Sequence, residues 1–231
     1  MSKLLWCDAR TTFVGDSLWG YCAIIKRHRM GQNIAILCDD YNKSVFEFFQ
    51  EYLIGCEDLT ISTDPSNKDI VEKFHSGPDS YEGPNEDLFN YLRKPLLPIV
   101  DSGSYICFQP WASSHNKMGR FFMNLQCKKR GYSVGVSQDN IMNGASPFHN
   151  RPISDVARLL FHSDGLAGVF SSMALFSSLL GKKTVVTNFD YTPISEIVPT
   201  GFNGPHNFII HNCGSSEEIK NAVNAHIGDY L

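Results

Sequence analysis

The sequence has no long hydrophobic run, no paired cysteines and no strong excess of charge. No stretch approaches 18 consecutive apolar residues, so we expect no membrane-spanning helix. The net charge is only −4, which is too small to indicate a nucleic-acid-binding protein on charge alone. An acidic residue stands as early as Asp8, which is atypical of a secretory signal peptide. We therefore expect a cytoplasmic protein.

The seven cysteines lack the spacing of a metal site or a disulfide framework. They are far apart in the sequence, and none belongs to a C-x-x-C pair. Several stand inside apolar runs, such as Cys38 after Ile36-Leu37 and Cys107 within residues 105–108. This pattern favours buried free thiols in a reducing compartment.

The sequence contains enough apolar residues for a large packed core. Hydrophobic residues make up 42% of the 231 residues, with 16 Phe among them, which excludes a disordered, collagen-like or coiled-coil chain. Two basic clusters, at residues 26–29 and 128–130, are predicted at helix C-termini. Because the helix dipole favours cations there in any protein, these clusters are weak evidence for a DNA-binding surface.

Short apolar runs alternate with helical periodicity in both halves of the chain, which predicts an α/β fold. We expect two Rossmann-like domains facing across a cleft, residues 1–100 and 101–231, with a Pro- and Gly-rich stretch at 63–98 leading to the boundary. A capping box at Ser215 and Glu218 predicts the start of the last helix. The predicted strands are 3–8, 33–38, 59–62, 104–108, 132–136, 167–170, 184–188 and 207–210, and the other predicted helices are 17–29, 43–53, 117–130, 153–162 and 172–180.

The first candidate site is the turn between the first predicted strand and helix. Gly15 permits a tight turn, and Asp16 follows it at the predicted start of the helix. Asp16 could cap the helix, which stabilises such a helix by about 1 kcal/mol. A carboxylate at this edge of the sheet could equally act as a general base for an acceptor hydroxyl. The sequence leaves both interpretations open.

The second candidate site follows the strand at 104–108. Ser113, Asn116 and Lys117 precede or open a helix, where hydroxyl and backbone N–H groups can donate to a phosphate and the ammonium offsets its charge. The pattern of a P-loop is missing, which excludes a P-loop nucleotidase. Lys117 could also be an ordinary solvated lysine.

The third candidate site follows the strand at 167–170. Ser171, Ser172 and Met173 open a helix and bring hydroxyl and backbone N–H groups to its N-terminus, which suits an anion. Plain N-capping by either serine is the alternative. Gln138 and Asp190 follow two further predicted strands and are weaker candidates for contacts with the same ligand.

The ordered set of motifs resembles glycosyltransferase family nine, the ADP-heptose-type heptosyltransferases. Gly15-Asp16 resembles the family's first loop, and Pro110-Trp111-Ala112-Ser113 with Lys117 resembles its Pro-Gly-Ala-Ser-like loop. The segment from Phe170 to Leu175, followed by residues 179–186, resembles the family's last turn and helix. Phe170 and Leu175 stand where the family has Asp and His in that turn, so we expect the donor to be held differently from ADP-heptose in the family, and the donor sugar stays open.

The resemblance implies a GT-B fold and metal-independent transfer, with inversion, from a nucleotide-diphosphate sugar that the second domain holds. It assigns the catalytic base to Asp16 and contacts with the donor phosphates to Ser113 and Lys117, and it matches Ser171 to the threonine of the family's last turn. The acceptor hydroxyl could belong to a surface glycan, a small molecule, or a hydroxymethylated base of phage DNA. The alternatives are a non-catalytic nucleotide-sugar-binding protein of the same fold and a sugar-nucleotide epimerase.

Overall fold

The computed structural model describes most of the chain. The described residues are 4–10, 14–66, 70–73, 88–111, 121–122, 124–135, 141–169, 171–188, 208–212 and 215–231. For residues 14–16, 19, 22, 70–73, 188 and 208–212 it describes the backbone alone. The described residues divide into two compact units, one made of residues up to Pro95 and the other of residues from Leu96 onward.

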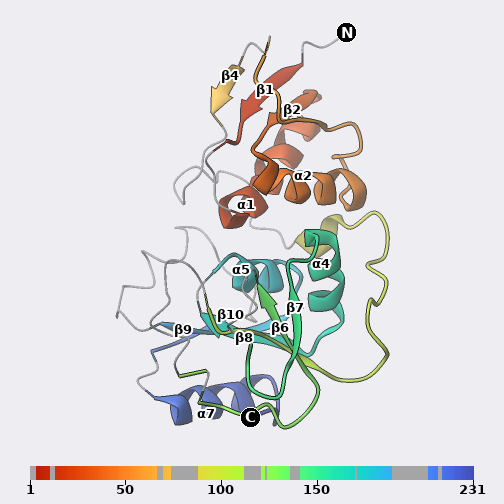
Figure 1. Ribbon diagram of the computed structural model, residues 1–231. Coiled ribbons are helices and arrows are strands. Elements are labelled where there is room, and N and C mark those ends of the chain that lie inside the picture. Colours follow the sequence, from red (N-terminus) through yellow and green to blue (C-terminus); the bar gives the residue numbers. More distant parts are fainter. Residues whose placement is uncertain are drawn as a thin grey trace. The chain divides into compact units, whose positions relative to one another are not determined.

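The first unit is a parallel four-stranded sheet with the strand order β3-β2-β1-β4 (Figure 1). Helix α2 carries a row of buried aromatic residues because Phe46, Phe49 and their neighbours recur at helical spacing. Tyr21 of helix α1 packs edge-on against Phe49, with ring centroids 6.3 Å apart. The elements of this unit are β1 (Leu5–Asp8), α1 (Val14–Arg29), β2 (Ile34–Leu37), α2 (Asp40–Tyr52), β3 (Thr60–Ser62), β4 (Ile70–Lys73) and the 3₁₀ helix η2 (Leu88–Tyr91).

The second unit is a parallel six-stranded sheet with the strand order β10-β9-β8-β5-β6-β7. Helices α4 and α5 lie on one face of this sheet and α7 on the other (Figure 1). This is the Rossmann order, in which strands one and four are neighbours at the centre. The elements are β5 (Ile106–Gln109), β6 (Gly131–Gly135), β7 (Ser146–His149), α4 (Ile153–His162), β8 (Gly165–Val169), α5 (Ser172–Leu179), β9 (Lys183–Asn188), β10 (Phe208–Asn212) and α7 (Ser216–His226).

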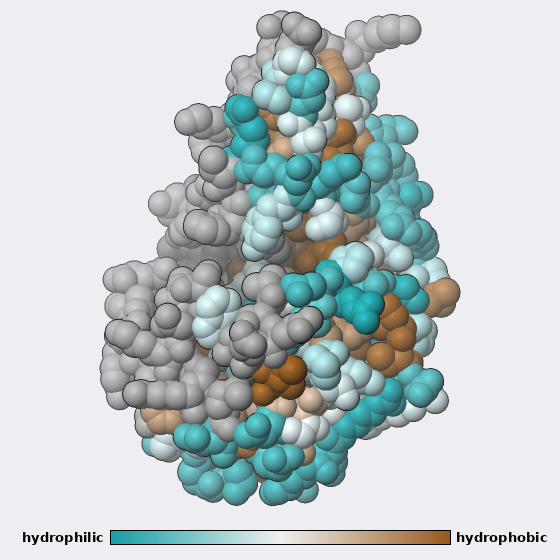
Figure 2. All heavy atoms as spheres, in the orientation of Figure 1, coloured by the Kyte–Doolittle hydropathy of each residue, from teal (hydrophilic) through white to brown (hydrophobic). Residues whose placement is uncertain are grey.

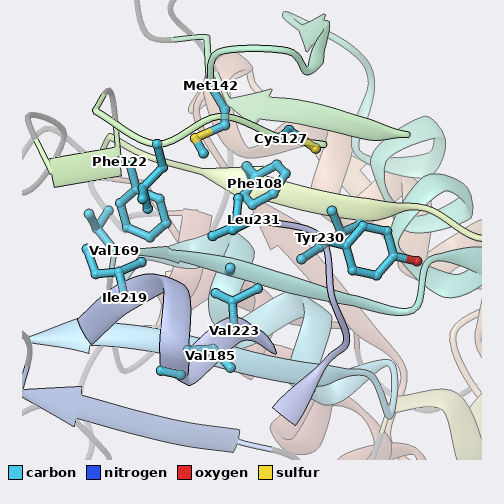
Figure 3. Close-up of a cluster of buried hydrophobic side chains, with 14 residues drawn as sticks. Phe108, Phe122, Cys127, Met142, Val169, Val185, Ile219, Val223, Tyr230 and Leu231 are labelled. Atoms are coloured by element: carbon cyan, nitrogen blue, oxygen red, sulfur yellow. The ribbon is translucent and has the colours of Figure 1, made fainter. Parts of the chain in front are cut away.

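A hydrophobic core of the second unit joins α7 to the sheet. Ile219 and Val223 of α7 lie beside Val169 and Val185 of the central strands (Figure 3). Phe108 of β5 is buried completely in the same cluster. These side chains exclude water from one face of the sheet and thereby hold the central strands in place.

The prediction of an α/β fold with parallel sheets is confirmed, and the structure adds two strands that the sequence did not indicate. Strand β4 pairs with β1 inside the stretch that was expected to be a linker with short helices. Strand β7 pairs with β6 and contains a proline, Pro147. Proline is tolerated there because β7 is an edge strand.

The prediction of a helix over 117–130 is wrong in its last part. Among the described residues of that stretch, 121 and 122 are helical, but 124–130 are not. Cys127 instead donates its backbone N–H to the carbonyl of Asn143 at 2.8 Å, and Gly131 begins strand β6 rather than ending a helix. The basic cluster at 128–130 therefore does not stand at a helix C-terminus. Its Lys128 Nζ donates to the carbonyl of Leu231 at 2.8 Å.

Large apolar side chains are scarce on the described surface. Met30, Tyr41, Ile54, Phe89 and Leu97 are the exposed examples. In Figure 2 the brown residues of the visible face occur in small groups among teal and white ones. Within the described part of the chain, no helix has both the length and the apolar content needed to cross a bilayer.

Candidate functional site

The centre of the second sheet is the point at which its strand order reverses. Strands β5 and β8 are neighbours there and run parallel, with Gln109 in register with Gly168. The chain leaves β5 toward one side of the sheet and β8 toward the other, which separates the loops that follow them. Ligands of such sheets bind at the carboxyl ends of the strands at this point. Two of the three segments singled out in the sequence follow these two strands.

Gln109 and Ser171 connect the two strand ends. The Ser171 hydroxyl donates to the side-chain carbonyl oxygen of Gln109, which is only 6% exposed. A Cβ atom at Gly168 would lie 2.5 Å from the backbone oxygen of Gln109, so glycine is needed for this close approach. Gln109 was not among the predicted site residues, because an amide at a strand end is not a recognisable motif.

Helix α5 begins directly after this contact. Ser171 is its N-cap in extended conformation, but its side chain makes no capping hydrogen bond. The alternative interpretation, in which the Ser171 side chain caps the helix, is therefore wrong, because its hydroxyl is directed to Gln109 instead. The first N–H groups of a helix have no acceptor within the helix. Those of Ser172 and Met173 can therefore donate to an anion at this end of α5.

The side chains at the start of α5 differ in how they could meet a ligand. Ser171 and Ser172 are partly exposed, whereas Met173 is 8% exposed and can offer a ligand chiefly its backbone N–H. Leu175, which stands at the position of a histidine in the family that the sequence resembles, is buried at 7% exposure. It has no polar group to donate to a phosphate.

Several predicted site residues lie outside the described residues. These are Ser113, Asn116, Lys117, Gln138 and Asp190, together with Phe170. Their roles stay predictions.

Gly15 and Asp16 lie in the first turn of α1, which begins at Val14, three residues earlier than expected. Asp16 is therefore not the N-cap, and that interpretation is wrong. An acidic residue in the first turn still favours the helix through its dipole.

A charged pair stands at the carboxyl end of β1 in the first unit. The Arg10 guanidinium donates to both carboxylate oxygens of Asp8, from Nε at 2.8 Å and from Nη2 at 2.7 Å. This hydrogen bonding, supported by the charges of Asp8 and Asp39, raises the pKa of Arg10 above its usual value. The pair was not predicted, although an Asp-x-Arg sequence at a strand end is compatible with it.

No group of three or more His, Cys, Asp or Glu side chains within the described ranges is arranged to hold a metal ion. The predicted independence of the reaction from a metal ion stays a prediction.

No protein-family profile and no curated protein sequence matches this sequence. Solved structures are similar. The E. coli heptosyltransferase WaaC with ADP has a TM-score of 0.64 at 10% identity, over 97% of this chain and 100% of WaaC. A family 9 glycosyltransferase from Veillonella parvula DSM 2008 has a TM-score of 0.58 at 9% identity, over 98% of each chain.

The heptosyltransferase TibC in complex with ADP-D-beta-D-heptose has a TM-score of 0.57 at 14% identity. The alignment covers 87% of this chain but only 61% of TibC, so the chain spans less than two thirds of that protein. These likenesses establish the fold, which is the GT-B-like fold of these glycosyltransferases. The expected resemblance to heptosyltransferases is thus confirmed at the level of the fold.

Proposed function

We propose that this chain is a glycosyltransferase that takes a sugar from a nucleoside-diphosphate sugar, with the second unit holding the diphosphate. The observation that carries the proposal is the junction at the centre of the second sheet. Gln109 and Ser171 join the ends of β5 and β8 there, and α5 begins beside them. The likeness to the fold of WaaC with ADP supports the same ligand class.

In the proposed reaction, the Asp16 carboxylate takes the proton of an acceptor hydroxyl. The acceptor oxygen then forms a bond to the anomeric carbon as the bond from that carbon to the diphosphate oxygen breaks, with inversion. The backbone N–H groups at the start of α5 and the Lys117 ammonium stabilise the negative charge of the departing diphosphate. The acceptor is a hydroxyl compound, for which a glycan, a small molecule and a hydroxymethylated DNA base are the classes to test.

A second candidate function is a nucleotide-sugar-binding protein without catalytic activity. Leu175 favours it, because a buried leucine stands where the family has a histidine. An epimerase is a third, and it would change the sugar nucleotide without any acceptor.

The Asp16→Asn variant separates these functions. We expect it to bind the donor with unchanged affinity but to lose turnover by about 100-fold or more, the usual contribution of a general base. Donor binding is measured by calorimetry, and turnover by release of the nucleoside diphosphate in the presence of acceptors. Turnover equal to that of the wild type would remove Asp16 from the mechanism. Tight donor binding with no turnover in the wild type, across all acceptor classes, would favour the binding protein.

A further inference from the structure

The described residues pass from the first unit to the second at one point, between Pro95 and Leu96. Relative motion is the usual behaviour of two compact units in one chain. The number of residues that neither unit holds decides about which backbone bonds such motion takes place. Hydrogen bonds on both sides of this point leave very few residues unheld.

The chain before Pro95 is held by the end of helix α2. The Arg93 N–H donates to the carbonyl of Tyr52 at 2.9 Å. The Arg93 guanidinium donates to two carbonyl groups in the last turn of α2, from Nε at 3.0 Å and from Nη2 at 2.9 Å. The Lys94 ammonium lies 2.6 Å from a carboxylate oxygen of Glu51 and 4.3 Å from the centroid of the Tyr52 ring. The first unit therefore holds the chain as far as Lys94.

The chain on the other side of the crossing is held by helix α4. The Leu96 side chain is only 1% exposed, and its carbonyl accepts a hydrogen bond from Nε2 of His162. Arg158 donates to the next two carbonyl groups, from Nε to Leu97 at 2.8 Å and from Nη2 to Pro98 at 3.4 Å. Three successive carbonyl groups are thus tied to one helix of the second unit.

Pro95 is the one residue between these two held segments, and it is exposed. Its ring fixes its own φ at about −65°. The same ring restricts the ψ of Lys94 to extended values through steric clash. The two torsions that stay free to rotate are therefore the ψ of Pro95 and the φ of Leu96.

We propose that this crossing is a hinge confined to Pro95. The two units turn relative to each other about the ψ bond of Pro95 and the φ bond of Leu96, and about no other backbone bond between residues 93 and 98. Because the proline removes one rotation and restricts another, the units reach only a narrow range of arrangements. The inference does not depend on the proposed function, since it concerns the protein without ligand.

Glycine substitutions at the two exposed prolines of this segment test the hinge. Pro95→Gly restores the φ rotation at the hinge, whereas Pro98→Gly makes the same chemical change in the segment that α4 holds. Nitroxide labels are attached to unnatural keto amino acids at Asp58 and Asn221, exposed positions of the first and second unit. Pulsed EPR measures the distribution of the distance between the labels. A label pair at Asn221 and Lys129, both in the second unit, is the control for folding.

We expect P95G to widen the distribution of distances between the two units relative to the wild type. P98G should keep the width of the wild type, because the residue before it is held by Arg158. P95A should give a smaller increase than P95G, since alanine restores the φ rotation but reaches fewer conformations than glycine. The distances within the second unit should be the same in the wild type and all three variants.

An unchanged distribution between the units in P95G would overturn the inference. Equal widening in P95G and P98G would overturn it as well, because the turning would then involve the segment that α4 holds. If P95G also alters the distances within the second unit, P95A decides the question. The inference then stands only if P95A widens the distribution between the units and leaves the second unit unchanged.

Discussion

At the residue scale, burial determines the thiol pKa and the reactivity of the described cysteines. Each of the five whose side chains are described is a buried free thiol, as the sequence predicts: Cys7, Cys38, Cys56, Cys107 and Cys127. Burial raises the pKa of Cys38 to about 11 and that of Cys56 to about 12. Because the thiolate is the reactive form, these cysteines should be inert at neutral pH.

We predict that at pH 8 a thiol reagent modifies at most two cysteines in the native protein and all seven in denaturant. A folded-state pKa above the unfolded value adds stability that is complete below the unfolded pKa, near 9. This stability is lost as the pH rises through the folded-state pKa. Because the Cys38 thiolate forms only near that pKa, native Cys38 should begin to react as the pH approaches 11. Rapid native modification of three or more thiols at pH 8 would contradict the burial of these side chains.

The central contact of the candidate site could be predicted only in part from single residues. Ser171 was predicted because small hydroxyl residues open a helix after an apolar run. Gln109 was not, because it is 62 residues away and only the pairing of β5 with β8 brings the two together.

At the scale of elements, a helix could be predicted wherever its apolar stripe or its cap is regular. The helix predicted at 153–162 has those bounds as α4, because its apolar stripe is regular. Ser215 accepts the N–H of Glu218 at 3.3 Å, which confirms half of the predicted capping box at the start of α7. Strands β4 and β7 were missed because strands of four residues carry too little periodicity to stand out among polar neighbours.

The side chain of Asn224 in α7 forms hydrogen bonds with the backbone of Tyr230 and Leu231. The Asn224 amide oxygen accepts the N–H groups of Tyr230 and Leu231 at 3.2 and 3.3 Å. Its Nδ2 donates to the carbonyl of Leu231 at 3.2 Å. Leu231 and Tyr230 are in turn buried in the core cluster of Figure 3.

We therefore predict that Asn224→Ala lowers the free energy of unfolding by about 1–3 kcal/mol, because it leaves buried polar groups without partners. Urea denaturation measures this. Asn221→Ala, one turn earlier at an exposed position of the same helix, should change the stability by less than about 0.5 kcal/mol. Equal effects of the two substitutions would mean that Asn224 does not hold the chain end.

At the scale of the whole molecule, the strand order decides where a ligand can bind. The order β10-β9-β8-β5-β6-β7 follows from no single motif, since it depends on which strands pair across long stretches of sequence. The alternation of strands and helices predicts a parallel sheet but does not by itself give the place of each strand. The likeness to WaaC at 10% identity agrees that the fold is kept while most side chains differ.

The start of α5 is the proposed binding site for the diphosphate of a nucleotide. Ser172 is the first residue of α5, and Ser171 before it is extended, as a residue before proline should be. Proline is therefore compatible with the fold at position 172, but Ser172→Pro removes one backbone N–H from the site. Ser172→Ala removes only the hydroxyl and is the matched control.

The most direct measurement is the melting temperature of the wild type, S172A and S172P with a panel of nucleoside diphosphates. A ligand at 100 times its dissociation constant stabilises a protein by about 2.7 kcal/mol. We predict that one of the nucleotides raises the melting temperature of the wild type and of S172A by the amount that corresponds to this free energy. The same nucleotide should raise the melting temperature of S172P clearly less. Without ligand, S172P should melt close to the wild type. No rise with any nucleoside diphosphate, or an equal rise in S172P, would contradict the account.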